Sequence, residues 1–311
     1  MKNPYLLTVK SSEKTAWIME EVLPTTYSLD LSKQFMPMPL QQENREDGNL
    51  SKEEYNLLSQ LLASSYCDFI AIVEKYIVDL VMNQFPMRQE DEKPRIRALS
   101  RFLDEEVKHQ LLFERFNQVL GSNLKQRLIF PDNGDEFNNK VMSKTPLSIW
   151  LLTLHSEIMT HFHYTFMFKS GIDLEPKFVE ILKFHWMEEA QHVKVDLLEI
   201  EALVKSSSEA ELNLAMDHYI ELLRLVDSEL AIANMAVIQN LKAIAGVVLS
   251  AQQELNLLTN LTKTSRELTI LTVLKHPTFI SAIKSMNIGY EAKLPELAKI
   301  FTVPLKNLNA A

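Results

Sequence analysis

Apolar residues recur every three to four positions over long stretches of the chain, and a strand-like alternation of apolar and polar residues is not sustained anywhere obvious. Four of these stretches predict long helices, which begin or end at residues that typically cap or stop helices. Their approximate ranges are 51–85, 94–121, 145–171 and 176–205. We therefore expect an all-α fold.

Capping signals refine these boundaries. Ser51 with Glu54 has the spacing of a capping box, in which each residue satisfies a backbone N–H of the first turn. Ser208 with Glu211 has the same spacing after a break at residues 206–208, and predicts a further helix. A later polar pair, Thr264 with Glu267, predicts the start of shorter C-terminal helices.

The lengths of the connections indicate the topology. Short loops join the first two helices and the last two, whereas residues 122–144 form a long connection between the pairs. This is the layout of a four-helix bundle with one long crossover. We expect residues 1–50 to form an arm over the bundle, residues 51–205 to form the bundle, and residues 206–311 to add helices packed on it, in a single globular unit.

Charge and composition exclude several classes of protein. A formal net charge of -9 argues against binding to nucleic acid, because phosphates need a basic face. A lone cysteine, Cys67, fits a reducing compartment, and the first residues lack the apolar run of a signal peptide. The apolar stretch from Leu230 to Ala251 is interrupted by polar residues, so it predicts a buried helix rather than a membrane span. We expect a cytoplasmic protein.

Two Glu-x-x-His pairs carry the candidate chemistry: Glu106 with His109, and Glu189 with His192. A spacing of three on a helix places both side chains on one face, where both reach one ion. The pairs fall on the second and fourth predicted helices. Their position in a bundle, rather than their number, makes them candidate metal ligands.

The first and third predicted helices each supply one further glutamate among apolar neighbours, Glu74 and Glu157. A lone carboxylate on such a face is costly unless it is paired or binds a metal. Four carboxylates balance two divalent ions, and mixed carboxylate and imidazole ligands suit iron or manganese. The order Glu, Glu-x-x-His, Glu, Glu-x-x-His is the ligand plan of ferritin-like di-metal carboxylate proteins.

A third histidine, His185, lies four residues before Glu189 on the same helix face. With it, the motifs over roughly residues 51–205 resemble those of the di-iron N-oxygenases typified by p-aminobenzoate N-oxygenase. The resemblance implies four glutamate and three histidine ligands, O2 activation at two irons and oxidation of an aryl amine towards a nitro group. The small subunits of ribonucleotide reductase share the plan, but Phe113 stands where they usually carry a radical tyrosine.

Other roles remain open for individual residues. In the alternative interpretation, Glu74 forms a buried ion pair with an arginine, Glu157 forms a hydrogen bond with His161, and His185 stacks on Trp186. Asp196, one turn after His192, is expected to orient that imidazole. Glu105 and Glu188 point about 100° away from the ligand face, so we expect them in solvent or in salt bridges.

The sequence thus predicts a non-haem di-iron oxygenase or oxidase that acts on a small organic molecule with O2, with an electron donor that the sequence does not identify. A non-enzymatic iron-storage or O2-binding protein and a di-metal hydrolase are the alternatives, since fold alone does not choose between them. We further expect a homodimer, as is common among soluble proteins.

Overall fold

The computed structural model describes residues 3–37, 50–84, 92–131 and 133–303. These residues are almost entirely helical or in turns, and their only β feature is an isolated bridge between Gln34 and Leu174. The predicted all-α class is confirmed. The four long helices of the bundle are α3 (Lys52–Gln84), α4 (Lys93–Leu124), α6 (Pro146–Lys169) and α7 (Pro176–Ser206).

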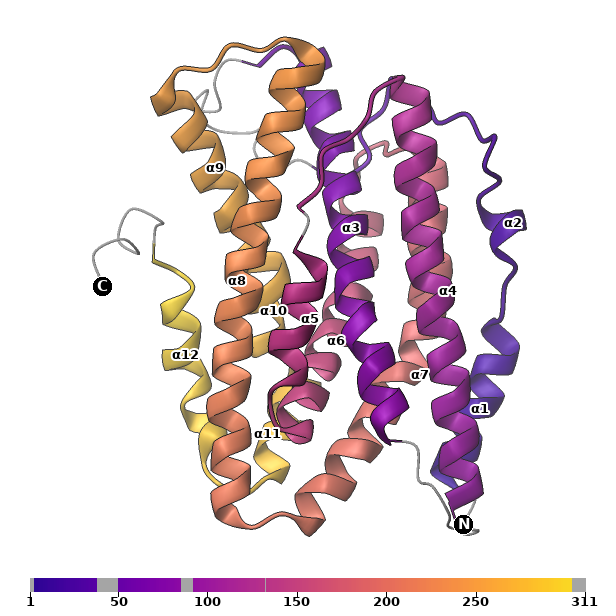
Figure 1. The fold of residues 1–311 in the computed structure, drawn as a ribbon, viewed down its shortest axis with the longest axis vertical. Helices are drawn as coiled ribbons and strands as arrows, with labels where there is room; N and C mark the ends of the chain where they lie inside the picture. Colours follow the sequence, from indigo (N-terminus) through magenta and orange to yellow (C-terminus); the bar gives the residue numbers. More distant parts are fainter. Residues whose placement is uncertain (1–2, 38–49, 85–91, 132, 304–311) are drawn as a thin grey trace.

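The bundle consists of two helix pairs. Helix α3 packs along α4, and α6 packs along α7, while contacts between α4 and α7 and between α3 and α6 close the bundle (Figure 1). The crossover between the pairs contains a short helix, α5 (Gly134–Met142), which packs on α3. This is a ferritin-like arrangement with one long crossover, in which side chains of all four helices can meet at the axis.

The predicted helix starts and stops are mostly confirmed. Ser51 and Glu54 form both hydrogen bonds of the capping box. The predicted stop near Phe85 lies just outside the described residues. The predicted stop at Gly121 is wrong, because α4 continues until Lys125 takes the left-handed conformation, with its N–H bonded to the carbonyls of Gly121 and Ser122. Gly121 instead lets the chain after the helix come close, since a Cβ there would lie 3.1 Å from the Gln126 carbonyl.

The C-terminal third adds helices against the bundle. Helix α8 (Glu209–Ala245) begins at the Ser208 capping box and packs on α3 and α6. The predicted start at Thr264 is wrong, because Ser250 with Gln253 caps the preceding helix α9 (Ala251–Arg266) and that helix runs through Thr264. A π-helical turn, η3 (Glu267–Leu271), follows it. Beyond η3 lie α10 (Thr272–Leu274), α11 (Pro277–Ser285), η4 (Tyr290–Ala292) and α12 (Leu294–Ile300).

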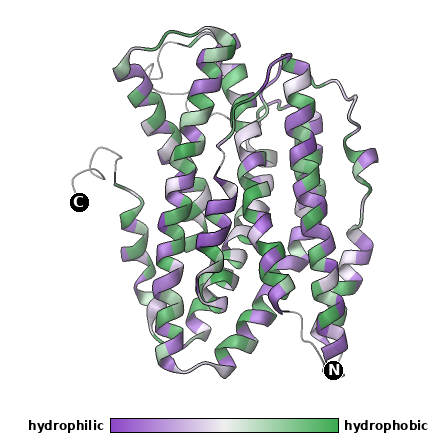
Figure 2. Cartoon of the chain, in the orientation of Figure 1, coloured by the Kyte–Doolittle hydropathy of each residue, from purple (hydrophilic) through white to green (hydrophobic). Residues whose placement is uncertain are grey.

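The N-terminal segment lies on the opposite flank. Helix α1 (Pro4–Thr15) packs on α4 and α7, and the short helix α2 (Met19–Val22) follows it beside α7 (Figure 1). Hydrophobic and hydrophilic residues are interleaved along the helices rather than gathered in separate segments (Figure 2). Among the described residues, no helix is long and apolar enough to cross a membrane.

Candidate metal centre

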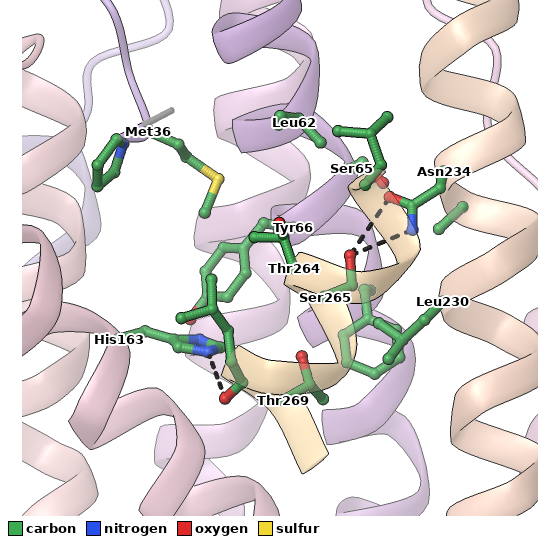
Figure 3. Close-up of a pocket in the computed structure, with 15 residues that line it drawn as sticks. Met36, Leu62, Ser65, Tyr66, His163, Leu230, Asn234, Thr264, Ser265 and Thr269 are labelled. Carbon is green, nitrogen blue, oxygen red and sulfur yellow. Dashed lines mark hydrogen bonds between the residues drawn. The ribbon is translucent and has the colours of Figure 1, made fainter. Parts of the chain in front are cut away.

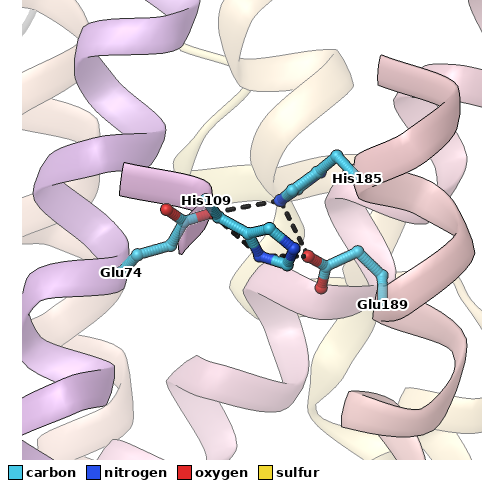
Figure 4. Close-up of side chains that lie close together, drawn as sticks. All are labelled: Glu74, His109, His185 and Glu189. Carbon is cyan, nitrogen blue, oxygen red and sulfur yellow. Dashed lines mark hydrogen bonds and ion pairs between the residues drawn. The ribbon is translucent and has the colours of Figure 1, made fainter. Parts of the chain in front are cut away.

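Seven titratable side chains from four helices meet near the axis of the bundle. Helix α3 contributes one, α4 two, α6 one and α7 three, and each of them is at most 3% exposed. They are Glu74, Glu106, His109, Glu157, His185, Glu189 and His192. Figure 4 shows four of them converging from α3, α4 and α7. The structure thus brings together every residue that the sequence predicts for the site.

The carboxylate of Glu189 lies between two groups of ligand atoms. Its Oε1 is 2.7 Å from Nε2 of His185 and 3.3 Å from Nδ1 of His109. Oε1 of Glu74 completes this first group, 3.1 Å from Nε2 of His185 (Figure 4). The other oxygen of Glu189 is 3.4 Å from Nδ1 of His192. Glu189 is therefore placed to bridge two adjacent positions.

The second group surrounds Nδ1 of His192. This nitrogen lies 2.8 Å from Oε1 of Glu106 and 3.6 Å from Oε2 of Glu157. Two overlapping sets of ligand atoms have a spacing that suits an ion, one with Glu74 and His185, and one with Glu106 and His192. Both sets include His109 and Glu189. Each set could hold one ion, so the centre offers ligand atoms for two.

Several atoms that face the centre have no hydrogen-bond partner, although they are buried. Among the described residues these include Nδ1 of His109, Nδ1 of His192, Oε2 of Glu74 and Oε2 of Glu157, together with both oxygens of Glu106. A buried polar atom without a partner is costly, and a cluster of such atoms is rare in folded proteins. Two divalent cations would satisfy all of these atoms at once, so the residues present fit a di-metal centre.

The protein electrostatics point the same way. Burial, and then the neighbouring Glu106 and Glu157, raise the pKa of Glu74 well above its usual value. Burial and then Glu157 raise the pKa of Glu106 to about 8. Burial lowers the pKa of both His109 and His185 well below the usual value. His192 differs, because burial, which lowers its pKa, is outweighed by Glu106 and Glu105, and its pKa lies well above the usual value. Without cations this centre therefore holds its protons on carboxyls and on His192 and leaves His109 and His185 neutral, and divalent metals would replace those protons.

Of the two expectations for Glu105 and Glu188, exposure to solvent is wrong, whereas salt bridges are confirmed: Arg101 lies 3.6 Å from Glu105 and Lys108 2.6 Å from Glu188. Both are buried, and each lies 2.9 Å from the outer nitrogen of a histidine on the opposite helix: Glu105 from Nε2 of His192, Glu188 from Nε2 of His109. The reason is that the face of α4 about 100° from its ligand face packs against α7. The corresponding face of α7 packs against α4. A signal was present in the sequence, since both motifs read Glu-Glu-x-x-His.

Hydrogen bonds to these two carboxylates fix the tautomers of His109 and His192. A carboxylate accepts, so Nε2 of His109 and of His192 carries the proton, and Nδ1 presents a lone pair to the centre. Hydrogen bonds from His192 and Ser12, which outweigh burial, lower the pKa of Glu105 to about 2. Lys108 forms an ion pair with Glu188 at 2.6 Å. Burial nevertheless raises the pKa of Glu188 to about 7, against the opposing effect of Lys108. Glu105 is therefore held ionised, whereas the charge on Glu188 depends on its ion pair with Lys108.

The N-terminal segment closes this side of the centre. Ser12 of α1 hydrogen-bonds Glu105, and the Trp17 ring stacks parallel to the ring of His109 with centroids 6.2 Å apart. Lys108 lies over the Trp17 ring, with its Nζ 4.1 Å from the ring centroid. The sequence gives no local signal for these contacts, because they join segments about 90 residues apart.

Asp196 does not orient His192: both of its oxygens are buried without a hydrogen-bond partner among the described residues, and Glu105 takes the histidine nitrogen. His161, rather than His185, lies against Trp186, with ring centroids 5.2 Å apart. Glu74 pairs with His185 and His109, and with no arginine within the described part of the chain.

The chain is similar to known proteins both in sequence and in fold. The family model of P-aminobenzoate N-oxygenase AurF matches residues 48–268, which is more than half of the chain. A comparison with curated proteins gave no match.

Among solved structures, two point mutants of an R2-like ligand-binding oxidase with an aerobically reconstituted Mn/Fe cofactor are similar to this chain. Their TM-scores are 0.53 and 0.51, each with 16% identity over 91% of this chain and 93% of that chain. At this identity the likeness shows the shared fold alone.

Proposed function

This chain belongs to the p-aminobenzoate N-oxygenase family, and we propose that it binds two iron ions at the centre described above and uses O2 to oxidise the nitrogen of a small organic amine. Membership confirms the resemblance predicted from the motifs and makes the chain an oxidoreductase of the di-metal, O2-dependent class. The observation that carries the finer proposal is the buried set of unpartnered carboxylate and imidazole atoms.

The seven residues divide between two metal positions that share Glu189. Glu74, His109 and His185 would hold the first ion, and Glu106, Glu157 and His192 the second. His109 and His192 would bind through Nδ1, because their outer nitrogens donate to Glu188 and Glu105. Four carboxylates would neutralise two divalent ions, which avoids leaving net charge in a buried site. Manganese suits the same ligands and is the other metal that we expect to bind.

Bound iron would supply the electrons and the open coordination positions that O2 chemistry requires. The chain itself excludes water, because the ligands are buried under aromatic rings such as Phe102, Phe113 and Trp17. Glu105 and Glu188 keep the protons on the outer nitrogens of the histidines, so that the inner nitrogens remain free to bind.

The balance of the reaction defines what else is needed. Insertion of one oxygen atom into an N–H bond sends the other oxygen of O2 to water, and this consumes two electrons and two protons. An external two-electron donor is therefore a partner of the enzyme. The homodimer and the cytoplasmic location stay predictions.

Loading with Fe(II) under nitrogen, followed by O2 and an aromatic amine, tests the proposal. We expect two irons per chain by metal analysis, a transient visible absorption band after O2, and a hydroxylamine or more oxidised product by mass spectrometry. Glu189→Ala should abolish binding of the iron pair. Glu201→Ala, an exposed change on the same helix, should leave it intact.

The alternative functions, an iron-storage or O2-binding protein and a di-metal hydrolase, predict different results in this assay. Reversible O2 binding with no product would contradict an oxygenase and favour a carrier or storage protein. Hydrolysis supported by zinc or manganese, without any reaction of Fe(II) with O2, would favour a hydrolase.

A further inference from the structure

Helix α1 is held on the bundle largely by polar contacts. Its buried residues are Thr8, Val9 and Ser12, and only Val9 among them is apolar. The segment α9–η3 differs, because it meets the bundle around a hollow lined mostly by apolar side chains, such as Leu62 and Leu230 (Figure 3). Burial of apolar surface is the main force that holds a helix to a core. Helix α1 therefore depends on its hydrogen bonds to remain docked.

Polar contacts anchor both ends of α1. Near its start, the hydroxyl of Tyr5 donates to Oε1 of Glu199 on α7 at 2.9 Å. Glu199 is 2% exposed, and Arg95 of α4 donates to its two oxygens at 2.8 and 2.6 Å. Near the end of α1, the side-chain nitrogen of Gln191 on α7 lies 3.3 Å from Oγ1 of Thr15. Each end of α1 is thus tied to α7, the helix that carries three of the candidate metal ligands.

Ser12, between these anchors, reaches the carboxylate that orients a candidate metal ligand. Its hydroxyl accepts from Nε of Arg101 at 2.8 Å and donates to Oε1 of Glu105 at 2.5 Å, because an ionised carboxylate only accepts. The other oxygen of Glu105 accepts from Nε2 of His192 at 2.9 Å. A continuous chain of hydrogen bonds therefore runs from α1 through α4 to His192 on α7, whose other nitrogen faces the second metal position.

Ser12 fixes the orientation of the Glu105 carboxylate. With α1 docked, Ser12 holds Oε1 while His192 holds Oε2, so both oxygens are engaged. Without α1, Oε1 would keep only Arg101 among the described residues, with Nη2 3.6 Å away. A metal-bound imidazole has to keep one orientation, and an acceptor that is already fixed favours that state. A docked α1 therefore favours metal binding through His192.

The first metal position has a support of another kind. Glu188 orients His109 there, and the ion-pair partner of Glu188 is Lys108, which belongs to the bundle helix α4. Of the two histidines that a carboxylate orients, His192 is thus the one whose support depends on α1.

We propose that Ser12 is a positioning residue for the second metal position, and that docking of α1 and binding of metal at this position strengthen each other. Linked equilibria are reciprocal: if a docked α1 raises the metal affinity by some factor, bound metal raises the docking equilibrium of α1 by the same factor. This coupling rests on the proposed metal centre, but not on the proposed reaction with O2. Helix α1 is then the element of the fold that responds to whether the second position is filled.

Calorimetric titration of the full-length, metal-free protein with Mn(II) measures the first half of this coupling. We expect Ser12→Ala to weaken one of two bound Mn(II) ions about 5-fold, at the lower end of the range for coupled sites because Ser12 acts through Glu105. The other ion should bind as in the wild type. Ser11→Ala, the adjacent hydroxyl on α1, is the matched control and should change neither ion.

The outcomes of this titration separate the coupling from the metal centre. A wild type that binds two Mn(II) ions, with a Ser12→Ala variant that binds both equally well, would overturn the coupling alone. Equal weakening of both ions would also contradict it, because the support of His109 does not involve Ser12. A wild type that binds no Mn(II) would refute the proposed centre and the coupling with it.

A double-mutant cycle distinguishes positioning from packing. Glu105→Ala removes the carboxylate through which Ser12 acts, so adding Ser12→Ala to that variant should cause no further loss of Mn(II) affinity. The same loss in both backgrounds would show that Ser12 acts independently of Glu105 and would contradict its assigned role.

Hydrogen exchange of the α1 backbone amides measures the reciprocal half, and it needs no variant near the centre. A helix of 12 residues is marginal in isolation, so the amides of α1 exchange when it undocks. Saturating Mn(II) should slow their exchange about 5-fold in the wild type, the factor that reciprocity requires. Exchange in α9, on the other flank, should not change. Exchange in α1 that is indifferent to Mn(II) would overturn the proposal.

Tyr5→Phe separates anchoring from coupling. It removes the hydrogen bond to Glu199 at the start of α1 and leaves the contact between Ser12 and Glu105 in place. Exchange in α1 should become faster than in the wild type, but Mn(II) should still slow it by the same factor. In Ser12→Ala, by contrast, the effect of Mn(II) on α1 should be absent. Loss of the Mn(II) effect in Tyr5→Phe would contradict the assignment of the coupling to Ser12.

Discussion

Oε2 of Glu105 on α4 lies 2.9 Å from Nε2 of His192 on α7, the nitrogen that points away from the candidate metal centre. This contact sets the tautomer of His192 and leaves Nδ1 free for a metal. The same arrangement recurs between Glu188 on α7 and His109 on α4. Each helix of the pair therefore supplies the carboxylate that orients the other helix's histidine.

We expect Glu105→Gln to weaken metal binding about 10- to 100-fold, because an amide is a poorer acceptor for the imidazole N–H than a carboxylate. Competition with a chelator of known affinity measures the change. Glu201→Gln on the exposed face of α7 is the matched control and should have no effect. Wild-type affinity in the Glu105 variant would mean that the contact does not support the metal.

Metal binding should raise thermal stability. The buried carboxylates repel one another in the metal-free protein, and a ligand that binds only the folded state stabilises it by mass action. Differential scanning calorimetry with and without Mn(II), which does not oxidise during the scan, should show a higher Tm with metal. Glu106→Ala should lose most of that increase, and a full increase in the variant would exclude Glu106 as a ligand.

The metal-free protein should become less stable as the pH rises from about 7 to about 8. Folded Glu106 has a pKa of about 8, raised first by burial, against about 4.5 in the unfolded chain, so the folded state holds a proton that the unfolded state has released. This group alone lowers the free energy of unfolding by about 1 kcal/mol over that window. Glu188, whose pKa burial raises to about 7, acts in the same direction.

Below pH 6.5 the buried, neutral His155 and His163 act in the opposite direction, which is why the test starts at pH 7. Urea unfolding at three pH values measures the slope. Saturating Mn(II) should abolish the fall, since bound metal keeps the carboxylates ionised. A rising stability in the metal-free protein would contradict the assignment of protons to this centre.

The start of α8 should tolerate change without damage to the centre. Ser208→Ala removes the side chain that caps the helix and should lower stability by about 1 kcal/mol. Ser206→Ala, at the end of α7 and outside the cap, should cost less. Both variants should bind metal as the wild type does, so a loss of metal in either would reveal an unexpected coupling between α8 and the bundle.

The sequence alone determined the long helices and the faces that carry their chemistry. Helical periodicity and capping are local properties, so Glu106 with His109 and Glu189 with His192 were readable from spacing of three within one helix. The order of the ligands along the chain then predicted that they would meet at one axis, as they do.

Only the tertiary structure decided what lies against the other faces. Several contacts depend on which helices pack against each other. They include the burial of Glu105 and Glu188, the stacking of Trp17 on His109, and the hydrogen bond from His163 to the Leu268 carbonyl in η3. Such contacts join residues far apart in sequence, and a helical pattern specifies the direction of a side chain but not the partner it will meet.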